Sequence, residues 1–258
     1  MLKKTFFCSD FHFGIPAKES TKDRENLLLK WLEESAPDMD ALYVLGDLFD
    51  FWFEYRQVVP KGGIRVLAAL SRIQDQGIPV HLFTGNHDQW MFGYIHEELG
   101  ISLYHDPIKV NKYGKNLVLG HGDGLGPGDH GYKFIKKVFR SPISRQLFGL
   151  IPPGIGIPLA KYWSGASRIK GVKENKFLGP EQEWLIQYCE AQIKVDPVDY
   201  FIFGHRHLPI DWKLSNGARY INLGDWLQYH SFATLDQDGF KYQFYQDLIS
   251  KPYSNFFI

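Results

Sequence analysis

The chain has 258 residues, of which 44% are apolar and 22% charged, as in a typical soluble globular protein with a large core. We expect one domain, residues 1–258, with a sizeable insertion rather than two independent domains. The apolar runs fall well short of the roughly 20 residues that cross a bilayer, which excludes an integral membrane protein. The two cysteines, Cys8 and Cys189, are too few for a disulfide framework and favour a reducing cytoplasm.

The formal net charge is zero, but the charges are unevenly distributed. Between His130 and Leu178 there are ten Lys and Arg residues and one acidic residue, Glu174, so this segment carries +9 and the remainder of the chain −9. Such local polarisation says more about partners than the total charge does. We therefore expect this segment to meet an anionic ligand or surface.

Short runs rich in β-branched and aromatic residues predict six buried strands. They are Thr5–Cys8, Ala41–Leu45, Pro79–Thr84, Asn116–Leu119, Asp199–Phe203 and Ala218–Leu223. Helical patterns lie at Lys22–Glu34, Ile64–Ile73 and Pro180–Ile193, and a hairpin pairs Ser231–Leu235 with Phe240–Phe244. Strands that alternate with helices indicate an α/β (α+β) domain.

Residues 125–178 interrupt this alternation. Two helical patterns flank the turn-rich stretch Ile151–Gly154, and each places apolar residues on one stripe beside Lys and Arg. We interpret the segment as a basic, amphipathic helical lid inserted into the domain. It either receives acyl chains, rests on an anionic bilayer, or simply packs on the core with a solvated basic face.

Polar clusters follow successive strands, and each cluster contains Asp, Asn or His. They are Asp10-Phe11-His12, Gly46-Asp47-Leu48-Phe49-Asp50, Gly85-Asn86-His87-Asp88, Gly120-His121-Gly122-Asp123 and Gly204-His205-Arg206-His207. Ligands of α/β sheets gather beyond the carboxyl ends of the strands, so we expect these clusters to converge. Imidazole, carboxylate and amide oxygen together suit Mn, Fe or Zn.

These five clusters resemble the motifs of the calcineurin-like metallophosphoesterases: Asp-x-His, Gly-Asp-x-x-Asp, Gly-Asn-His-(Asp/Glu), His and Gly-His-x-His. The resemblance implies a four-layer αββα sandwich of two mixed sheets flanked by helices. It also implies two divalent metal ions, with Mn²⁺ as the first expectation and Fe or Zn as alternatives. One ion would be held by Asp10, His12, Asp47 and His207, and the second by the bridging Asp47 with Asn86, His121 and His205.

Two divalent ions about 3.5–4 Å apart can clamp a phosphate and lower the pKa of a bridging water. His87 matches the family histidine that donates to a phosphate oxygen or to the leaving group, and Asp88 is expected to orient its imidazole. Asp50 and Asp123 have two interpretations. They either accept hydrogen bonds from groups around the metal ions, or cap a turn or a helix.

A closer resemblance concerns the run Leu42–Trp52 and the His-Gly-Asp that opens the lid, which are similar to UDP-2,3-diacylglucosamine hydrolases. That family releases UMP from UDP-2,3-diacylglucosamine and leaves 2,3-diacylglucosamine 1-phosphate, a step of lipid A biosynthesis. The residues expected to contact substrate are Asn86, His87, Asp129, Tyr132, Ser167, Lys173 and His205. The chain departs from the well-known branch at His87, where that branch has Arg. A guanidinium binds phosphate without proton transfer, whereas a histidine can also act as a general acid, so the resemblance defines the reaction class more firmly than the substrate.

Two other functions fit the same fold. A general phosphodiesterase or phosphatase for nucleotides or nucleic acid would need no apolar groove, and a catalytically silent scaffold should have lost ligands that this chain retains. We expect an anionic amphiphilic substrate and no nucleic acid. The expected location is the cytoplasm, with the lid as a peripheral contact to the inner face of the inner membrane; the sequence makes no prediction of oligomeric state.

Overall fold

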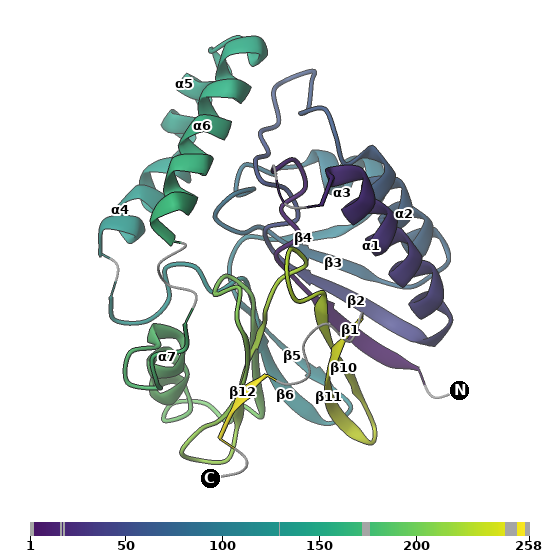
Figure 1. Ribbon diagram of the computed structural model, residues 1–258, viewed down its shortest axis with the longest axis vertical. Coiled ribbons are helices and arrows are strands. Elements are labelled where there is room, and N and C mark those ends of the chain that lie inside the picture. Colours follow the sequence, from purple (N-terminus) through teal and green to yellow (C-terminus); the bar gives the residue numbers. More distant parts are fainter. Residues whose placement is uncertain are drawn as a thin grey trace.

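The protein consists of two stacked sheets, helices on their outer faces, and a group of three helices that extends beyond them (Figure 1). The computed structural model describes residues 3–15, 17, 19–128, 130–171, 176–245 and 252–255, except for the side chains of residues 164–171. Within these ranges, no helix combines the length and the apolar character that crossing a membrane requires.

The first sheet has six strands in the spatial order β11-β10-β1-β2-β3-β4. Strands β1 to β4 are parallel, and β10 and β11 form an antiparallel hairpin at the opposite edge. Their bounds are β1 (Lys4–Cys8), β2 (Met39–Leu45), β3 (Val80–Phe83), β4 (Ser102–Tyr104), β10 (Ser231–Asp236) and β11 (Gly239–Phe244).

The second sheet has the order β12-β8-β9-β7-β6-β5, in which the neighbours β6, β7 and β9 are parallel. Its strands are β5 (Ile108–Lys112), β6 (Lys115–Leu119), β7 (Tyr200–Phe203), β8 (Pro209–Lys213), β9 (Arg219–Leu223) and β12 (Tyr253–Ser254). The six strands and the hairpin expected from the sequence are present, with ends that differ by at most two residues. Strands β4, β5, β8 and β12 were not predicted: β4 and β12 have at most three residues, β5 is only partly buried, and Pro209 and Asp211 interrupt the apolar pattern of β8.

Helices cover the outer face of each sheet, so the four-layer sandwich of two mixed sheets is confirmed. The first sheet is covered by α1 (Thr21–Ser35), the 3₁₀ turn Ala36–Asp38, α2 (Ile64–Asp75) and α3 (Tyr94–Leu99), and the second by α7 (Trp184–Gln192). Strand β1 shows why the sequences of the strands are continuous apolar runs. Phe6 packs outward against the helices and Phe7 inward against the second sheet, because successive side chains point to opposite faces and both faces are buried.

Between β6 and α7 the chain forms α4 (His130–Phe139), α5 (Pro142–Gly149) and α6 (Pro153–Gly171). The sequence predicted two helices here, and the structure has three because Pro142 starts a new helix at a position where its missing N–H costs nothing. Phe148 and Ala160 anchor the group by packing against Phe51, Phe53 and Trp90 of the sandwich.

Candidate metal centre

The parallel strands of both sheets direct their carboxyl ends to one edge of the sandwich, and the polar clusters lie there. Glycines permit the close approach of the side chains. A Cβ at Gly85 would overlap the Asp47 carboxylate, and one at Gly204 would overlap that of Asp10. Gly85 and Gly204 are therefore required by the space that the two carboxylates occupy.

The backbone at this edge is strained. Seven non-glycine residues among those described have positive φ, and five of them belong to the clusters: Asp10 (59°), His12 (46°), Asp47 (52°), His205 (71°) and His207 (51°). The left-handed region is unfavourable for residues with a Cβ, and such conformations concentrate at functional sites where the surrounding structure enforces them. Here they turn consecutive polar side chains toward one point.

One group consists of Asp10, His12, Asp47 and His207, whose potential ligand atoms all lie within 4.8 Å of one another. His12 Nε2 is 3.2 Å from His207 Nε2 and 3.5 Å from Asp47 Oδ2. His207 Nε2 is 3.4 Å from Asp10 Oδ1. Two imidazole nitrogens and two carboxylate oxygens thus face a common point, where their lone pairs would repel one another without a proton or a metal ion between them.

A second group adjoins the first and shares Asp47 with it. Asn86 Oδ1 is 3.1 Å from His121 Nε2 and 2.9 Å from His205 Nδ1, and His121 Nε2 is 3.3 Å from Asp47 Oδ2. That Asp47 oxygen is buried and accepts no hydrogen bond from the described residues. Asp47 Oδ2 lies between His12 and His121, which is the position that a ligand bridging two metal ions requires.

The outer nitrogens of two histidines have acceptors that leave the inner nitrogens suited to a metal. His121 Nδ1 lies 2.9 Å from the carbonyl oxygen of Leu45, and His207 Nδ1 lies 3.1 Å from Asp225 Oδ2. In a neutral ring, an acceptor at Nδ1 places the proton there, so Nε2 has the lone pair that a metal would bind. The donor types of both groups, and the Nδ1 acceptors of His121 and His207, therefore fit a pair of divalent cations.

The buried carboxylates favour positive charge around them. Burial opposes ionisation of Asp47, yet His121 and the neighbouring imidazoles hold the pKa of Asp47 well below its ordinary value. Burial also opposes protonation of His207, but Asp10 and the other nearby carboxylates raise the pKa of His207 to about 9. Buried carboxylates in proteins are normally paired or bound to metal, and these lie where cations would complete them.

The carboxylate beside the His87 imidazole belongs to Asp50, which corrects the expectation that Asp88 orients this ring. His87 Nδ1 is 3.2 Å from the Asp50 carbonyl oxygen and 3.5 Å from Asp50 Oδ1. The Asp88 carboxylate is fully buried and accepts from the backbone N–H groups of Gly85 (2.7 Å) and Phe49 (3.2 Å). Asp88 thus joins the loops after β2 and β3, while Asp50 contacts the imidazole.

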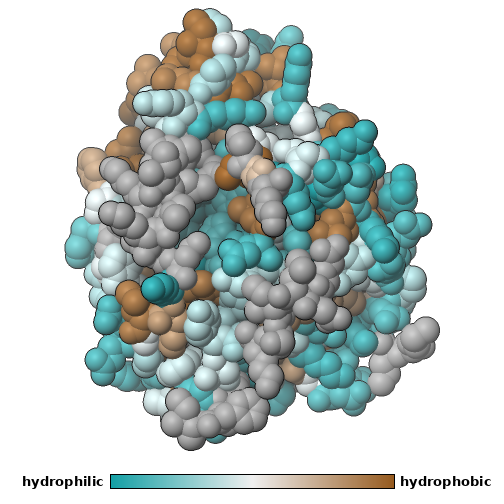
Figure 2. Space-filling model, viewed as in Figure 1, coloured by the Kyte–Doolittle hydropathy of each residue, from teal (hydrophilic) through white to brown (hydrophobic). Residues whose placement is uncertain are grey.

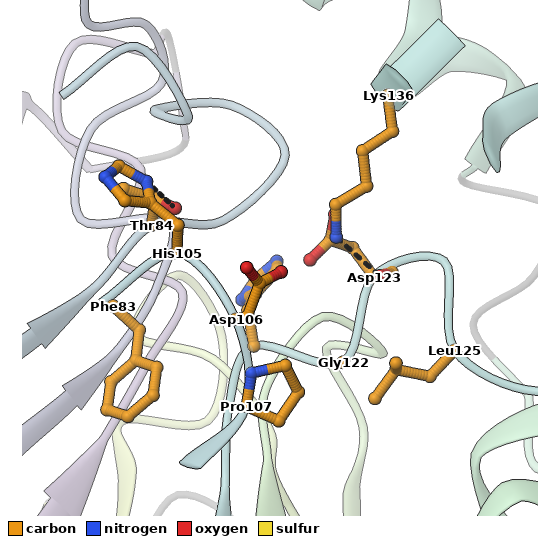
Figure 3. Close-up of a pocket in the computed structure, with 10 residues that line it drawn as sticks. Phe83, Thr84, His105, Asp106, Pro107, Gly122, Asp123, Leu125 and Lys136 are labelled. Atoms are coloured by element: carbon orange, nitrogen blue, oxygen red, sulfur yellow. Dashed lines mark hydrogen bonds and ion pairs between the residues drawn. The ribbon is translucent and has the colours of Figure 1, made fainter. Parts of the chain in front are cut away.

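A small pocket lies beside His121, between the strand ends and α4. Figure 3 shows Lys136 extending from α4 to Asp123, with Asp106 and Pro107 on the opposite wall. Lys136 Nζ is 2.6 Å from Asp123 Oδ2, and the hydroxyl of Tyr132 donates to the same oxygen at 2.5 Å. Asp123 therefore ties α4 to the segment that carries His121.

Of the residues expected to contact substrate, Tyr132 lies next to the centre, with its ring centroid 6.4 Å from that of His205. Asn86, His87 and His205 line the centre itself, as the distances above show. Asp129, Lys173 and the side chain of Ser167 lie outside the described residues.

Asp225 is a site residue that the sequence reasoning missed. It follows Gly224 at the end of β9 as Asp47 follows Gly46 at the end of β2, and this repeated pattern was the available signal. Its carboxylate is buried and contacts His207, as described above.

Comparison with known proteins gives the family to which the chain belongs. Residues 3–209 match the family model described as calcineurin-like phosphoesterase, and the chain belongs to this family of metal-dependent hydrolases. A Porphyromonas gingivalis protein named UDP-2,3-diacylglucosamine hydrolase is 36% identical over 249 residues, which cover 92% of this chain and 95% of that protein. An Aeromonas hydrophila protein of the same name is 30% identical over 230 residues, covering 87% and 91%. The solved structure of a phosphoesterase from E. coli covers 95% of each chain, with 17% identity and a TM-score of 0.48.

Proposed function

We propose that this chain hydrolyses UDP-2,3-diacylglucosamine to UMP and 2,3-diacylglucosamine 1-phosphate, a reaction of lipid A biosynthesis. The observation that carries the proposal is the similarity over nearly the whole chain to proteins named for this activity. The phosphoesterase family accounts for the reaction class, and the proposed lid, residues 125–178, accounts for an amphiphilic substrate.

We assign one metal ion to Asp10, His12, Asp47 and His207, and the second to Asp47, Asn86, His121 and His205. Mn²⁺ is the proposed metal because of the resemblance to UDP-2,3-diacylglucosamine hydrolases; the mixture of imidazole, carboxylate and amide oxygen by itself suits Mn, Fe or Zn. When bound, two such ions supply positive charge to the substrate phosphate and acidify a water molecule.

The remaining roles fall to the chain's own side chains. With Nδ1 directed at Asp50, the His87 imidazole is assigned to the substrate through Nε2, where it donates to a phosphate oxygen or to the leaving oxygen. Tyr132 is assigned to the substrate from α4, together with Asp129, Ser167 and Lys173. The ion pair between Lys136 and Asp123 holds α4 beside the metal centre.

The α4–α6 group carries the apolar surface that acyl chains or a bilayer would meet. Nine of the fifteen exposed large apolar residues in the described part of the chain lie between Phe134 and Trp163, including Leu147 and Leu150 at 61% and 80% exposure. Figure 2 shows apolar surface at the end of the molecule where Figure 1 places α5. We propose a cytoplasmic enzyme whose lid contacts the anionic inner face of the inner membrane.

Substrate choice is tested by supplying the Mn²⁺-loaded protein with UDP-2,3-diacylglucosamine or with a UDP-sugar that lacks acyl chains. Release of UMP, measured by chromatography, is expected from the acylated compound only, because the apolar lid supplies binding energy that the short compound cannot use. Equal turnover of both compounds would contradict the proposal. The proposal would also be contradicted if the protein cleaved an aryl phosphodiester but neither of the two UDP compounds. That result would favour the alternative function, a general phosphodiesterase.

Membrane contact is tested by co-sedimentation with vesicles that contain an anionic phospholipid. Leu150→Glu is expected to reduce the bound fraction several-fold, because it places a negative charge on the apolar surface beside the basic residues of the lid. Val195→Glu is the matched control, since Val195 is 78% exposed but follows α7, outside the lid. If the two variants lost equal fractions of vesicle binding, or if binding did not depend on anionic lipid, the proposed membrane contact would be wrong. The lid would then serve substrate binding only.

A further inference from the structure

The turn after β9 is built around one carboxylate. Asp225 Oδ1 accepts from the backbone N–H groups of Leu227, Gln228 and Tyr229 at 3.2, 2.8 and 3.2 Å. The residue is 5% exposed. Three converging hydrogen bonds from the backbone leave this side chain a single orientation.

The second oxygen of Asp225 points at the candidate metal centre. Oδ2 lies 3.1 Å from His207 Nδ1, whereas Nε2 of the same ring lies 3.2 Å from His12 Nε2 and 3.4 Å from Asp10 Oδ1. The His207 ring thus spans the distance between the Asp225 carboxylate and the group of ligand atoms. A carboxylate can only accept at Nδ1, so a neutral His207 ring carries its proton there and its lone pair on Nε2.

The same turn also supports Asp10. The backbone N–H of Trp226 donates to the Asp10 carbonyl oxygen at 3.1 Å, and the Trp226 ring stacks on Phe11 with 5.0 Å between centroids. Because Trp226 belongs to the outer core of the first sheet, the turn is anchored to the body of the protein. Two members of one ligand group, His207 and Asp10, are therefore contacted by a single turn.

We propose that Asp225 is a positioning residue for the metal held by Asp10, His12, Asp47 and His207, and that it acts by setting the tautomer and orientation of His207. This inference rests on the proposed function only in that His207 is taken as a ligand. It holds for whatever phosphoester the enzyme cleaves. It predicts that the two metal positions respond differently to a change at Asp225, because His121 and His205 belong to the other position.

An aspartate is required for this role and an asparagine cannot replace it. Oδ1 and Oδ2 both accept, so the amide NH₂ of an asparagine would have to face either the three backbone N–H groups or His207 Nδ1. Only the second placement avoids donor facing donor, and it forces the proton of His207 onto Nε2. That tautomer has no lone pair for the metal.

The experiment measures Mn²⁺ binding to the full chain by titration calorimetry, with bound metal counted after dialysis. Asp225→Asn is expected to weaken one of two ions by about 10- to 100-fold, the usual effect of losing such an outer partner, and to leave the other unchanged. Asp211→Asn is the matched control, because Asp211 is a buried carboxylate of the second sheet that pairs with Arg219 away from the centre. The metal affinities of the Asp211→Asn variant are expected to equal those of the unmodified protein.

A double variant separates positioning from a general loss of structure. Once His207→Ala has removed the ligand, adding Asp225→Asn is expected to cause no further loss of metal affinity, since Asp225 acts through that ring. Denaturant unfolding of the metal-free proteins checks that each variant is folded. Wild-type affinity for both ions in Asp225→Asn would overturn the proposal while leaving the proposed substrate intact. Additive losses in the double variant would also overturn it, as would binding of fewer than two ions by the unmodified protein.

Discussion

Replacing Asp47 with asparagine is expected to lower kcat by at least about a thousand-fold, a loss larger than that of a single transition-state hydrogen bond. Asp47 Oδ2 is 3.5 Å from His12 Nε2 and 3.3 Å from His121 Nε2, so it serves both ligand groups. Asparagine keeps an acceptor for the backbone N–H of His87, which donates to Asp47 Oδ1 at 2.9 Å, but it removes the negative charge. Steady-state rates with saturating Mn²⁺, and metal counts after dialysis, measure the two consequences.

A matched control for this change is Asp236→Asn. Asp236 is also a buried aspartate that accepts from backbone N–H groups, those of Asp238 and Gly239 in the hairpin turn, but it lies outside the candidate centre. The Asp236→Asn variant is expected to bind both metal ions and to keep full activity. If Asp47→Asn retained more than about a tenth of the activity with two bound ions, the assignment of Asp47 as the bridge would be wrong.

Replacing His87 with glutamine is expected to lower kcat by about 10²- to 10⁴-fold, the range for loss of a positioned proton donor, and to leave the metal content unchanged. The imidazole lies beside the ligand group, with 4.8 Å between the ring centroids of His87 and His12, and its Nδ1 faces Asp50. If it protonates the leaving oxygen, the loss grows with the pKa of the leaving alcohol. A series of phosphodiesters with graded leaving groups measures this slope.

His87→Arg gives a second comparison at the same position. A guanidinium binds phosphate but does not transfer a proton, so this variant is expected to cleave substrates with good leaving groups and to fail with poor ones. A loss in His87→Gln that is equal for every leaving group would show that His87 only binds phosphate. Wild-type rates in both variants would remove His87 from the site.

The candidate centre could be predicted because it depends on local sequence. Apolar runs indicate where strands lie, and a glycine followed by Asp, Asn or His indicates where they end. Parallel strands bring such ends to one edge of a sheet, so the sequence alone places Asp10 and Asp47 together. The structure groups all seven expected ligands there.

Contacts between distant segments could not be predicted in the same way. Asp88 is the sequence neighbour of His87, but adjacent side chains diverge, and the fold brings Asp50 from another loop to the imidazole. Asp225 had the right local pattern, yet its contact with His207 depends on the turn that its own carboxylate organises.

By itself, the sequence determined the class of fold, the edge of the sheets where ligands gather and the basic amphipathic character of residues 125–178, because periodicity, motif spacing and charge are local properties of the chain. The tertiary structure alone decided which carboxylate faces which imidazole, and which apolar residues of α4–α6 stay exposed. These outcomes depend on packing between segments far apart in sequence, where a side chain's partner is set by the shape of the whole core.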